Sequence, residues 1–485
     1  MGFKFVFLWS DVALWAIAAA VVAYALHMRR DLNLRANWLK VLRDPAALSA
    51  GVVLLFFVMV TMLDSVHFRR ALPPTSTATA DNNTQVFYDT HTESLLDLAL
   101  ARQIAMRETT YSSPLATHGH TKESITADGT TVRDFPRLAF GGAHLKNPDQ
   151  EWAGDVAARV VTGLLGAALV FALLGAGAGW LLRRAQGGFR QALRDVLADR
   201  THYPVRAALF TLLGVCVIAG PAIALMDHYH VLGSDRTGND VLVQALKSVR
   251  TAFVIGSLAT LATLPLALGL GILAGYFRGW VDEAIQYLYT TLTSVPNVLL
   301  IAACVLMVQV FLDKHPEFFE TGAERSDLKI FLLCVILGLT GWATLCRLVR
   351  GETLKLRELD YVQAASAFGV GHVRIMMRHI APNVMHLVLI TTVLNFSDLI
   401  LYEAVLTYVG VGVDPATSSF GSMINLARSE MSRDPVVWWS FVAAFGFMVT
   451  LVLAANLFAD GVRDAFDPRA RSMRPRVLSK FRIKV

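Results

Sequence analysis

The chain has 485 residues, of which 54% are hydrophobic and 17% are charged, with a formal net charge of +6. Its mean hydropathy is +0.49. A soluble protein of this length does not need so many apolar residues, so the composition excludes a soluble globular fold and predicts an all-α, polytopic membrane protein. The four cysteines have no Cys-x-x-Cys spacing and no histidine cluster has metal-ligand spacing, so the sequence predicts no bound metal.

Nine apolar runs have about 18 residues or more, the length that crosses a bilayer as a helix. They lie near 9–27, 46–63, 156–182, 207–226, 251–275, 287–311, 330–348, 384–406 and 437–459. Lys and Arg collect after the first run, after the third run and in the C-terminal tail. Because short basic loops stay in the cytoplasm, this pattern predicts an external N-terminus and a cytoplasmic C-terminus.

The first run could instead be a cleaved signal peptide, because Lys4 precedes it and residues 23–25 (Ala-Tyr-Ala) are similar to a cleavage site. Asp11 at the start of the run argues against this alternative. Cleavage would also leave Arg29 and Arg30 outside, against the charge rule. We therefore expect a membrane-spanning first helix.

The chain is expected to have five parts, with the main boundary in the basic segment 187–206. These are two N-terminal transmembrane helices in 1–63, a periplasmic segment in 64–155, a third transmembrane helix with a basic cytoplasmic linker in 156–206, a six-span core in 207–471 and a basic cytoplasmic tail in 472–485. The periplasmic segment is predicted to be partly disordered near 73–80. One amphipathic helix is expected in it from Leu95, Leu96, Leu98, Leu100 and Ile104.

Residues 360–383, DYVQAASAFGVGHVRIMMRHIAPN, form a polar, basic segment between two apolar runs. Residues recurring at helical spacing predict a first short helix, with Tyr361, Ala364, Ala365 and Phe368 on one face. Gly369 and Gly371 then permit a sharp turn. A second helix from about 372 to 380 should stop near Pro382, because proline lacks the amide donor. The segment is therefore predicted to be a docking hairpin.

The hairpin resembles the cytoplasmic loop of ABC importer permeases, whose pattern is Glu-Ala-Ala, three residues, Gly, and a stretch ending near Pro. That pattern falls here on Gln363, Ala364, Ala365, Gly369 and Pro382. Flanking residues similar to those of the oligopeptide and dipeptide branch, which includes nickel importers, are Asp360, Tyr361, Arg378, His379 and Asn383. Gln363 replaces the usual Glu and keeps its length but not its charge. A generic connector between membrane helices would explain the basic charge but not the combined spacing.

Two further segments resemble this family. Residues 232–240 contain Asp235, Gly238 and Asp240 of an external Leu-Gly-Thr-Asp-x-x-Gly-Arg-Asp pattern. Asp235 is expected to cap a helix or to bond a turn, in a vestibule that faces a substrate-delivering protein. Residues 402–424 match a second pattern that is expected to form a re-entrant external loop around a cavity, at Glu403, Ala404, Leu406, Gly410, Gly412, Pro415 and Gly421.

Asp398 and Glu403 are interpreted as the only carboxylates near the middle or outer end of a core span. Their position leaves a structural role at the gate and contact with substrate open. The loop 276–282 (YFRGWVD) and the ending 456–469 also resemble the family.

No phosphate-binding loop of the form G-x-x-x-x-G-K-[ST] occurs, so this chain is expected to be no enzyme and to bind no cofactor. The resemblance implies a type I importer permease core with three additional N-terminal helices, in a bacterial inner membrane. It also implies a second permease, two ATPase subunits that hold ATP and Mg and dock on the hairpin, and an external substrate-binding protein. The basic tail is expected to contact membrane lipid and no nucleic acid.

The function predicted from the resemblance is that of a permease subunit of an ATP-driven importer of dipeptides or oligopeptides. Three alternatives remain open at this point. An importer of the same family could carry nickel or another solute. An ion-coupled secondary transporter would need carboxylates or histidines near the membrane midplane, which the core spans largely lack. A membrane scaffold would have no use for an ATPase dock.

Overall fold

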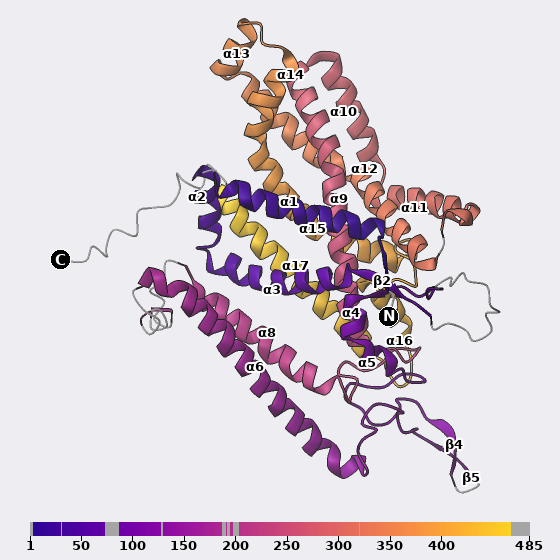
Figure 1. Cartoon of the computed structure of the whole chain (residues 1–485). Coiled ribbons are helices and arrows are strands. Elements are labelled where there is room, and N and C mark those ends of the chain that lie inside the picture. The colour runs from indigo at the N-terminus through magenta and orange to yellow at the C-terminus, as the bar shows by residue number, and fades with distance from the viewer. Residues whose placement is uncertain are drawn as a thin grey trace, which may run out of the picture.

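The computed structural model describes residues 3–30, 32–72, 87–127, 130–186, 191, 195–196, 203–319 and 321–466. Within these residues, nine helices are long and apolar enough to cross a membrane, which confirms the predicted helical membrane fold (Figure 1). They are α1 (Trp9–Met28), α3 (Pro45–Asp64), α6 (Pro148–Gln186), α8 (Val205–Leu225), α9 (Val241–Phe277), α11 (Asn297–Lys314), α12 (Gly322–Arg357), α15 (Ala381–Tyr408) with the helical turns before it, and α17 (Trp439–Phe466).

Shorter helices connect or cap these spans. They are α2 (Leu32–Val41), α4 (Leu95–Ala99), α5 (Ala101–Ala105), α10 (Gly279–Ser294), the 3₁₀ turn η1 (Pro316–Phe318), α13 (Asp360–Ala367), α14 (His372–Ile375), the π-helical turn η2 (Met376–Ile380) and α16 (Phe420–Glu430). The predicted disorder near 73–80, the central part of the basic linker and the end of the chain from 467 onward, with the predicted tail, lie outside the described residues.

In the part of the chain that the structure describes, five short strands form two antiparallel sheets at one end of the molecule (Figure 1). The first sheet has the order β1 (Phe3–Val6), β2 (His67–Arg70) and β3 (Glu93–Ser94), and joins the N-terminus to the segment after α3. The second is the hairpin of β4 (Glu123–Ala127) and β5 (Thr130–Asp134). We call this the sheet end, and the extremity formed by α13 and α14 the hairpin end.

The sixth predicted span begins ten residues late. The run 287–311 was expected to be one helix, but α10 ends at Ser294 and α11 starts at Asn297. Val295 between them is extended, with φ −89° and ψ 135°. Because Pro296 disfavours a helical conformation in the residue before it, the chain breaks there. The span that crosses is therefore α11.

Helices α9 and α12 lie side by side and share the most extensive helix contact among the described residues (Figure 1). A Cβ added to Gly271 would lie 2.9 Å from the carbonyl oxygen of Cys346, and one added to Gly275 would lie 2.8 Å from that of Arg350. Gly338 of α12 is equally close to Ala262 of α9. Small residues therefore bring the two backbones together, as they do in many membrane helix pairs.

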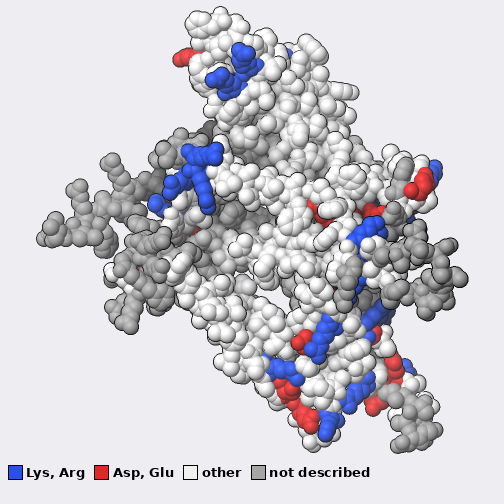
Figure 2. All heavy atoms as spheres, viewed as in Figure 1, with Lys and Arg blue, Asp and Glu red and all other residues white. Residues whose placement is uncertain are grey.

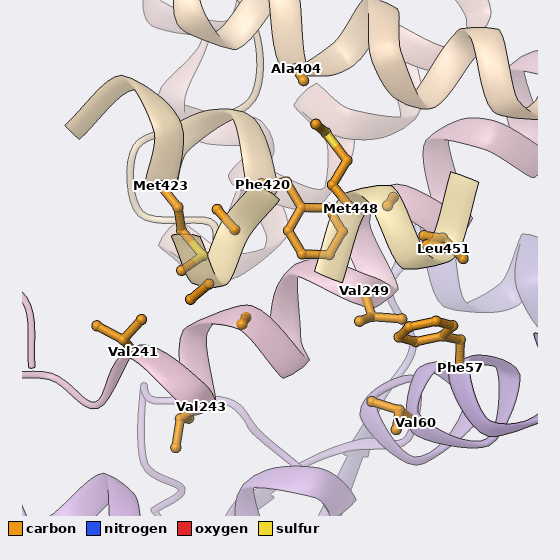
Figure 3. Close-up of a cluster of buried hydrophobic side chains, with 14 of the residues drawn as sticks. Phe57, Val60, Val241, Val243, Val249, Ala404, Phe420, Met423, Met448 and Leu451 are labelled. Atoms are coloured by element: carbon orange, nitrogen blue, oxygen red, sulfur yellow. The ribbon is translucent and has the colours of Figure 1, made fainter. Parts of the chain in front are cut away.

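Helix α3 packs inside the core. Its Phe57 and Val60 are buried against Val249 of α9 and against Met448 and Leu451 of α17 (Figure 3). By contrast, α8 contacts α6 and α3, and Leu225 is its only fully buried residue. The packing therefore places α3 with the six-span core, although the predicted boundary at residue 207 remains a prediction.

The segment after α3 has more structure than one amphipathic helix. Two five-residue helices, α4 and α5, meet at Leu100. Leu96 and Leu100, four residues apart, are buried in the core cluster, while Leu95, Leu98 and Ile104 are exposed. The prediction of one amphipathic helix is therefore wrong, because the helix breaks at Leu100 and only Leu96 and Leu100 face the core.

Candidate functional site

The predicted hairpin forms the extremity beside the ends of α10 and α12 (Figure 1). Helix α13 begins at Asp360, whose acidic side chain in the first turn suits the positive end of the helix dipole. Gly369 has φ +75°, a conformation that glycine adopts without strain. Gly371 has φ −57° and precedes α14, so only one of the two predicted turn glycines needs to be glycine.

The second helix of the hairpin does not stop near Pro382, as the sequence predicted. The chain stays helical from α14 through η2 into α15, and Pro382 lies in the first turn of α15. The backbone N–H of Ala381 donates to the carbonyl of Met376, five residues back, so the turn before the proline is widened. Asn383 Nδ2 donates to the His379 carbonyl at 2.6 Å, which satisfies an acceptor in the same turn. A π turn therefore accommodates a proline that would otherwise break the helix.

The hairpin has a buried face and an exposed face. Val362, Ile375 and Ile380 are buried in the cluster formed with α9, α10 and α12. On the outer side, three large apolar residues lie in the open, with Phe368 87%, Val373 70% and Met377 69% exposed. Tyr361, Gln363, Ala364 and Arg378 are also exposed, whereas Ala365 and His379 are half-buried. Exposed apolar side chains gathered at a tip are typical of a protein interaction site.

Polar contacts anchor the hairpin to the ends of the long helices. The Tyr276 hydroxyl of α9 is 2.9 Å from His372 Nδ1 of α14. Arg357 of α12 donates to the Tyr276 carbonyl at 2.5 Å. Within the hairpin, Asn383 Nδ2 donates to the Tyr361 hydroxyl at 3.1 Å. The predicted loop 276–282 therefore contacts the hairpin directly, through Tyr276.

The neighbouring Glu358 explains why position 363 carries Gln and not Glu. Its Nε2 donates to the Glu358 carbonyl at 3.3 Å and lies 3.5 Å from Glu358 Oε2, while that carboxylate also pairs with Arg278. A glutamate at position 363 would place a second carboxylate beside Glu358, and like charges at this distance repel. The amide keeps the contact without the repulsion.

An ion pair joins α12 to α10 beside the hairpin. Arg350 of α12 donates to both carboxylate oxygens of Asp282 in α10, at 2.6 and 2.7 Å. These hydrogen bonds hold the pKa of Asp282 below its ordinary value, because the guanidinium stabilises the ionised carboxyl. Bidentate pairing fixes α10 against α12 next to the hairpin.

At the sheet end, the two predicted aspartates, Asp235 and Asp240, have different structural roles. Asp235 Oδ1 accepts hydrogen bonds from the backbone N–H groups of Thr237 and Asn239, at 2.8 and 2.9 Å, so it bonds a turn. Asp240 caps α9 by accepting from the N–H of Leu242 at 2.8 Å. Gly238 between them has φ +78°, and a Cβ there would lie 1.8 Å from the Glu108 carbonyl oxygen.

A buried triad joins this loop to the segment after α3. His230 Nδ1 is 2.8 Å from Asp240 Oδ2, and its Nε2 is 3.6 Å from Glu108 Oε1. Burial would lower the pKa of His230, but the two carboxylates outweigh it and raise that pKa to about 9. Burial would raise the pKa of Glu108, but His230 and the N–H groups of residues 139–141 lower it to about 2. His230 and Glu108 are therefore both held in their ionised forms.

The loop between α15 and α16 is irregular, as expected for residues 409–419. Gly410 has φ +87°, and a Cβ on Gly412 would lie 1.9 Å from Thr407 Oγ1. Glu403 is 1% exposed and accepts a hydrogen bond from Thr407 at 2.8 Å. Asp398 faces outward from α15. This geometry favours the structural alternative for Glu403 over contact with substrate.

A cavity of about 540 Å³ at the sheet end brings three of the predicted residues together, Asp235, Asp240 and Pro415. The N-terminal part of the chain contributes His91 and Asp97 to its wall. Glu403, Gly410 and Gly412 are not among its lining residues; they shape the α15–α16 connection instead. The predicted vestibule residues thus divide into a lining group and a supporting group.

Sequence reasoning missed a buried group of charges. Asp327 lies in α12 and is 4% exposed, so the interpretation of Asp398 and Glu403 as the only carboxylates in that part of the core spans is wrong. Arg250 of α9 is 7% exposed and lies beside it. The sequence did contain a signal for this pair: Arg250 and Asp327 have opposite charges and lie at the edges of two apolar runs. Charges at such positions are costly unless they are paired.

Comparison with known proteins defines the class. The family model "Binding-protein-dependent transport system inner membrane component" matches residues 267–472. The chain belongs to this family, whose members are non-catalytic permease subunits of ABC importers in the inner membrane. This confirms the resemblance seen in the hairpin and sets aside the ion-coupled transporter and the scaffold.

Three relatives show the range of similarity. The oligopeptide transport system permease protein OppC of Mycobacterium tuberculosis is 32% identical over 245 residues, which cover 50% of this chain and 78% of the relative. OppC of Escherichia coli is 30% identical over 246 residues, covering 51% and 74%. The glutathione transport system permease protein GsiD of Pectobacterium atrosepticum is 31% identical over 290 residues, covering 56% and 89%.

Proposed function

We propose that this chain is the permease subunit of an importer for dipeptides or oligopeptides. The names of the relatives support a peptide cargo, since two of the three are oligopeptide permeases and the third transports glutathione, itself a small peptide. The relatives, all about 30% identical to this chain, are named for different cargoes, so their names do not identify the cargo of this chain. Uptake must therefore be measured with several solutes.

The hairpin is proposed to dock an ATPase subunit. The observation that carries this assignment is the exposed apolar tip at Phe368, Val373 and Met377, held by the anchored face at Val362 and Ile375. A partner that buries these side chains would gain the free energy of removing them from water. By family, two ATPases, a second permease and an external binding protein complete the assembly, with ATP and Mg on the ATPases.

The hairpin end is proposed to be cytoplasmic and the sheet end periplasmic. Figure 2 supports this orientation, because the charged side chains at the hairpin end are mostly Lys and Arg, whereas both signs are mixed at the sheet end. Basic residues 29–43 and the linker 187–206 would then lie on the cytoplasmic side with the hairpin. The N-terminal strand would lie outside with the first sheet.

The proposed mechanism is mechanical. Closure of the ATPases on nucleotide would move the docked hairpin, and the contacts of Tyr276 and Arg357 would pass this motion to α9 and α12. The spans would then switch between an inward-facing and an outward-facing arrangement. Nucleotide can drive this switch only by its different affinity for the two states.

The decisive experiment is co-purification followed by reconstituted uptake. The tagged chain is isolated from its own membranes in mild detergent, and its partners are identified by mass spectrometry. The assembled complex is then tested in proteoliposomes with labelled trialanine, glutathione and a nickel–histidine chelate. ATP-dependent uptake of trialanine supports the peptide proposal, whereas uptake of the chelate alone would refute it in favour of the nickel alternative.

A further inference from the structure

Arg250 of α9 is the centre of a buried group of polar side chains near the sheet end. Its guanidinium donates to Asp11 Oδ1 at 2.5 Å and to Ser10 Oγ at 2.8 Å, both in α1. It lies 3.7 Å from Asp327 Oδ1 of α12. The backbone N–H of Ser10 donates to Asp327 Oδ2 at 3.0 Å, which closes the group. Three helices that are far apart in sequence thus meet at one guanidinium.

The contacts in this group depend on each other. Asp11 and Asp327 are 3% and 4% exposed, so neither carboxylate has bulk water to replace a lost partner. Two carboxylates share the single guanidinium of Arg250, and Asp11 has a further partner in His67 Nδ1 at 2.7 Å. Breaking one contact leaves an uncompensated buried charge, which is far more costly than losing an exposed ion pair.

A second set of contacts ties the N-terminal part to the start of α12. Arg69 of β2 donates to Glu324 Oε1 at 2.7 Å and to Thr321 Oγ1 at 3.1 Å. Strand β2 pairs with β1, which leads into α1. Strand β2 and helix α1 therefore both contact the first turns of α12.

The charged group borders open space. Asp64, His67, Arg250 and Asp327 contribute to the wall of a cavity of about 770 Å³. If α1 moves away from α9 and α12, water in this cavity reaches the separated charges. The group is therefore built to separate at a lower free-energy cost than a charge cluster enclosed in protein.

The same two helices reach the hairpin at their other ends. Arg250 and Tyr276 are both in α9, about 39 Å apart along the axis at about 1.5 Å per residue. Asp327 lies in the second turn of α12 and Arg357 in its last turn. Since α9 and α12 are in close backbone contact, motion at one end of the pair is transmitted to the other as a tilt or shift of packed helices.

We propose that Ser10, Asp11, Arg250 and Asp327 form a latch that holds α1 across the ends of α9 and α12, and that the latch opens and closes in the transport cycle. Arg250 is its positioning residue. The first helix of the chain is then a working part of the transporter, although it lies outside the region matched by the family model. The inference rests on the importer family and does not depend on a peptide cargo.

Distance measurements test the opening directly. Spin labels are placed at Trp9→Cys and Gly322→Cys, both exposed, in a chain whose four cysteines are replaced by alanine. The assembled complex in nanodiscs is measured without nucleotide and with ATP and vanadate. We expect the label distance to change by about 2 Å or more between the two states. An unchanged distance in a complex that hydrolyses ATP would overturn the proposal.

A second measurement separates positioning from folding. Asp327→Asn should raise ATP hydrolysis in the absence of binding protein about fivefold, because hydrolysis is no longer linked to the latch. Asp327→Glu keeps the carboxylate and should restore the wild-type rate. Asp313→Asn, which removes an exposed ion pair with Arg325, is the matched control. An Asp327→Asn complex that is fully assembled but hydrolyses ATP as the wild type does would refute the latch.

The partners within the latch are tested by combining variants. Asp11→Asn and Asp327→Asn remove different contacts of the same Arg250, so their effects on hydrolysis should not add. Additive effects would show that the two carboxylates act separately and would contradict a common latch. If the wild-type complex hydrolyses no ATP, the importer assignment itself fails, which is a different outcome from failure of the latch.

Discussion

Backbone conformation at single residues separates required glycines from tolerated ones. Gly369 has positive φ in open space, so its requirement comes from the backbone and not from a neighbour. Gly371 has an ordinary φ and equally open surroundings. The sequence shows two identical glycines in one turn, and only the backbone angles tell them apart.

Gly369→Ala should therefore destabilise the hairpin turn by about 1 kcal/mol, because a Cβ disfavours positive φ. Gly371→Ala is the matched control and should have little effect. ATPase co-purification with the permease, measured over a range of detergent stringency, reports on the turn. Equal loss with both variants would show that φ at Gly369 does not control the hairpin.

Gly369→Trp should abolish ATP-coupled uptake without unfolding the chain, and normal uptake with that variant would contradict the docking role of the hairpin.

At the scale of elements, the hairpin presents an apolar tip on a firmly anchored base. Its base is held by Tyr276 of α9 and by a buried apolar cluster with α9, α10 and α12, while its own sequence supplies the exposed side chains. This separation makes it possible to change the tip without disturbing the base.

Phe368→Asp should abolish co-purification of the ATPase, since a charge would be buried in the proposed interface. The chain itself should fold normally, because the side chain is 87% exposed. Phe140→Asp, at an exposed position in the segment after α3, is the control and should leave the ATPase bound. A Phe368→Asp chain that keeps its ATPase would place the dock elsewhere.

The two helices on either side of the segment 65–204 differ in their packing. Phe57 of α3 is 3% exposed within the core cluster, whereas Phe210 of α8 is 60% exposed. The same amino acid is therefore structural in one helix and peripheral in the other. This contrast favours α3, rather than α8, as the helix that completes the core.

Phe57→Ala should lower the free energy of unfolding by about 3–5 kcal/mol, the usual effect of emptying a packed aromatic site. Phe210→Ala should change it by less than about 1 kcal/mol. Thermal aggregation of the detergent-solubilised chain, followed by size-exclusion chromatography, compares the two variants. Similar losses for both would argue that α8 is as much a part of the core as α3.

At the scale of the whole molecule, distant segments of the chain meet at the sheet end. The triad of Glu108, His230 and Asp240 joins the segment after α3 to the start of α9, and the latch joins α1 to α9 and α12. These contacts link parts that are separated by more than a hundred residues. They hold the N-terminal part of the chain against α9 and α12.

The triad should make this attachment depend on pH. The pKa of His230 is raised from 6.5 to about 9, so its stabilising effect is complete below pH 6.5 and is lost as the pH rises through 9. The pKa of Glu108 is lowered from 4.5 to about 2, so its effect is complete above pH 4.5 and is lost as the pH falls toward 2. Attachment should therefore be strongest between pH 4.5 and 6.5.

Hydrogen exchange of the amides at 139–141, which donate to Glu108, measures this attachment when corrected for the intrinsic pH dependence of exchange. Protection should fall between pH 7 and pH 9 in the wild type. His230→Gln should show weaker protection with no such fall, because glutamine does not titrate there. A fall of equal size in both chains would assign the pH dependence to another group.

The sequence by itself determined the membrane fold, the nine spans to within about ten residues and the position of the hairpin, because hydropathy and short motifs are local properties. Only the tertiary structure decided how Pro382 is accommodated by a π turn, that α3 packs in the core, and that Arg250 gathers carboxylates from α1 and α12. These features depend on contacts between residues far apart in the chain. The sequence of one segment does not specify which distant segment it will pack against.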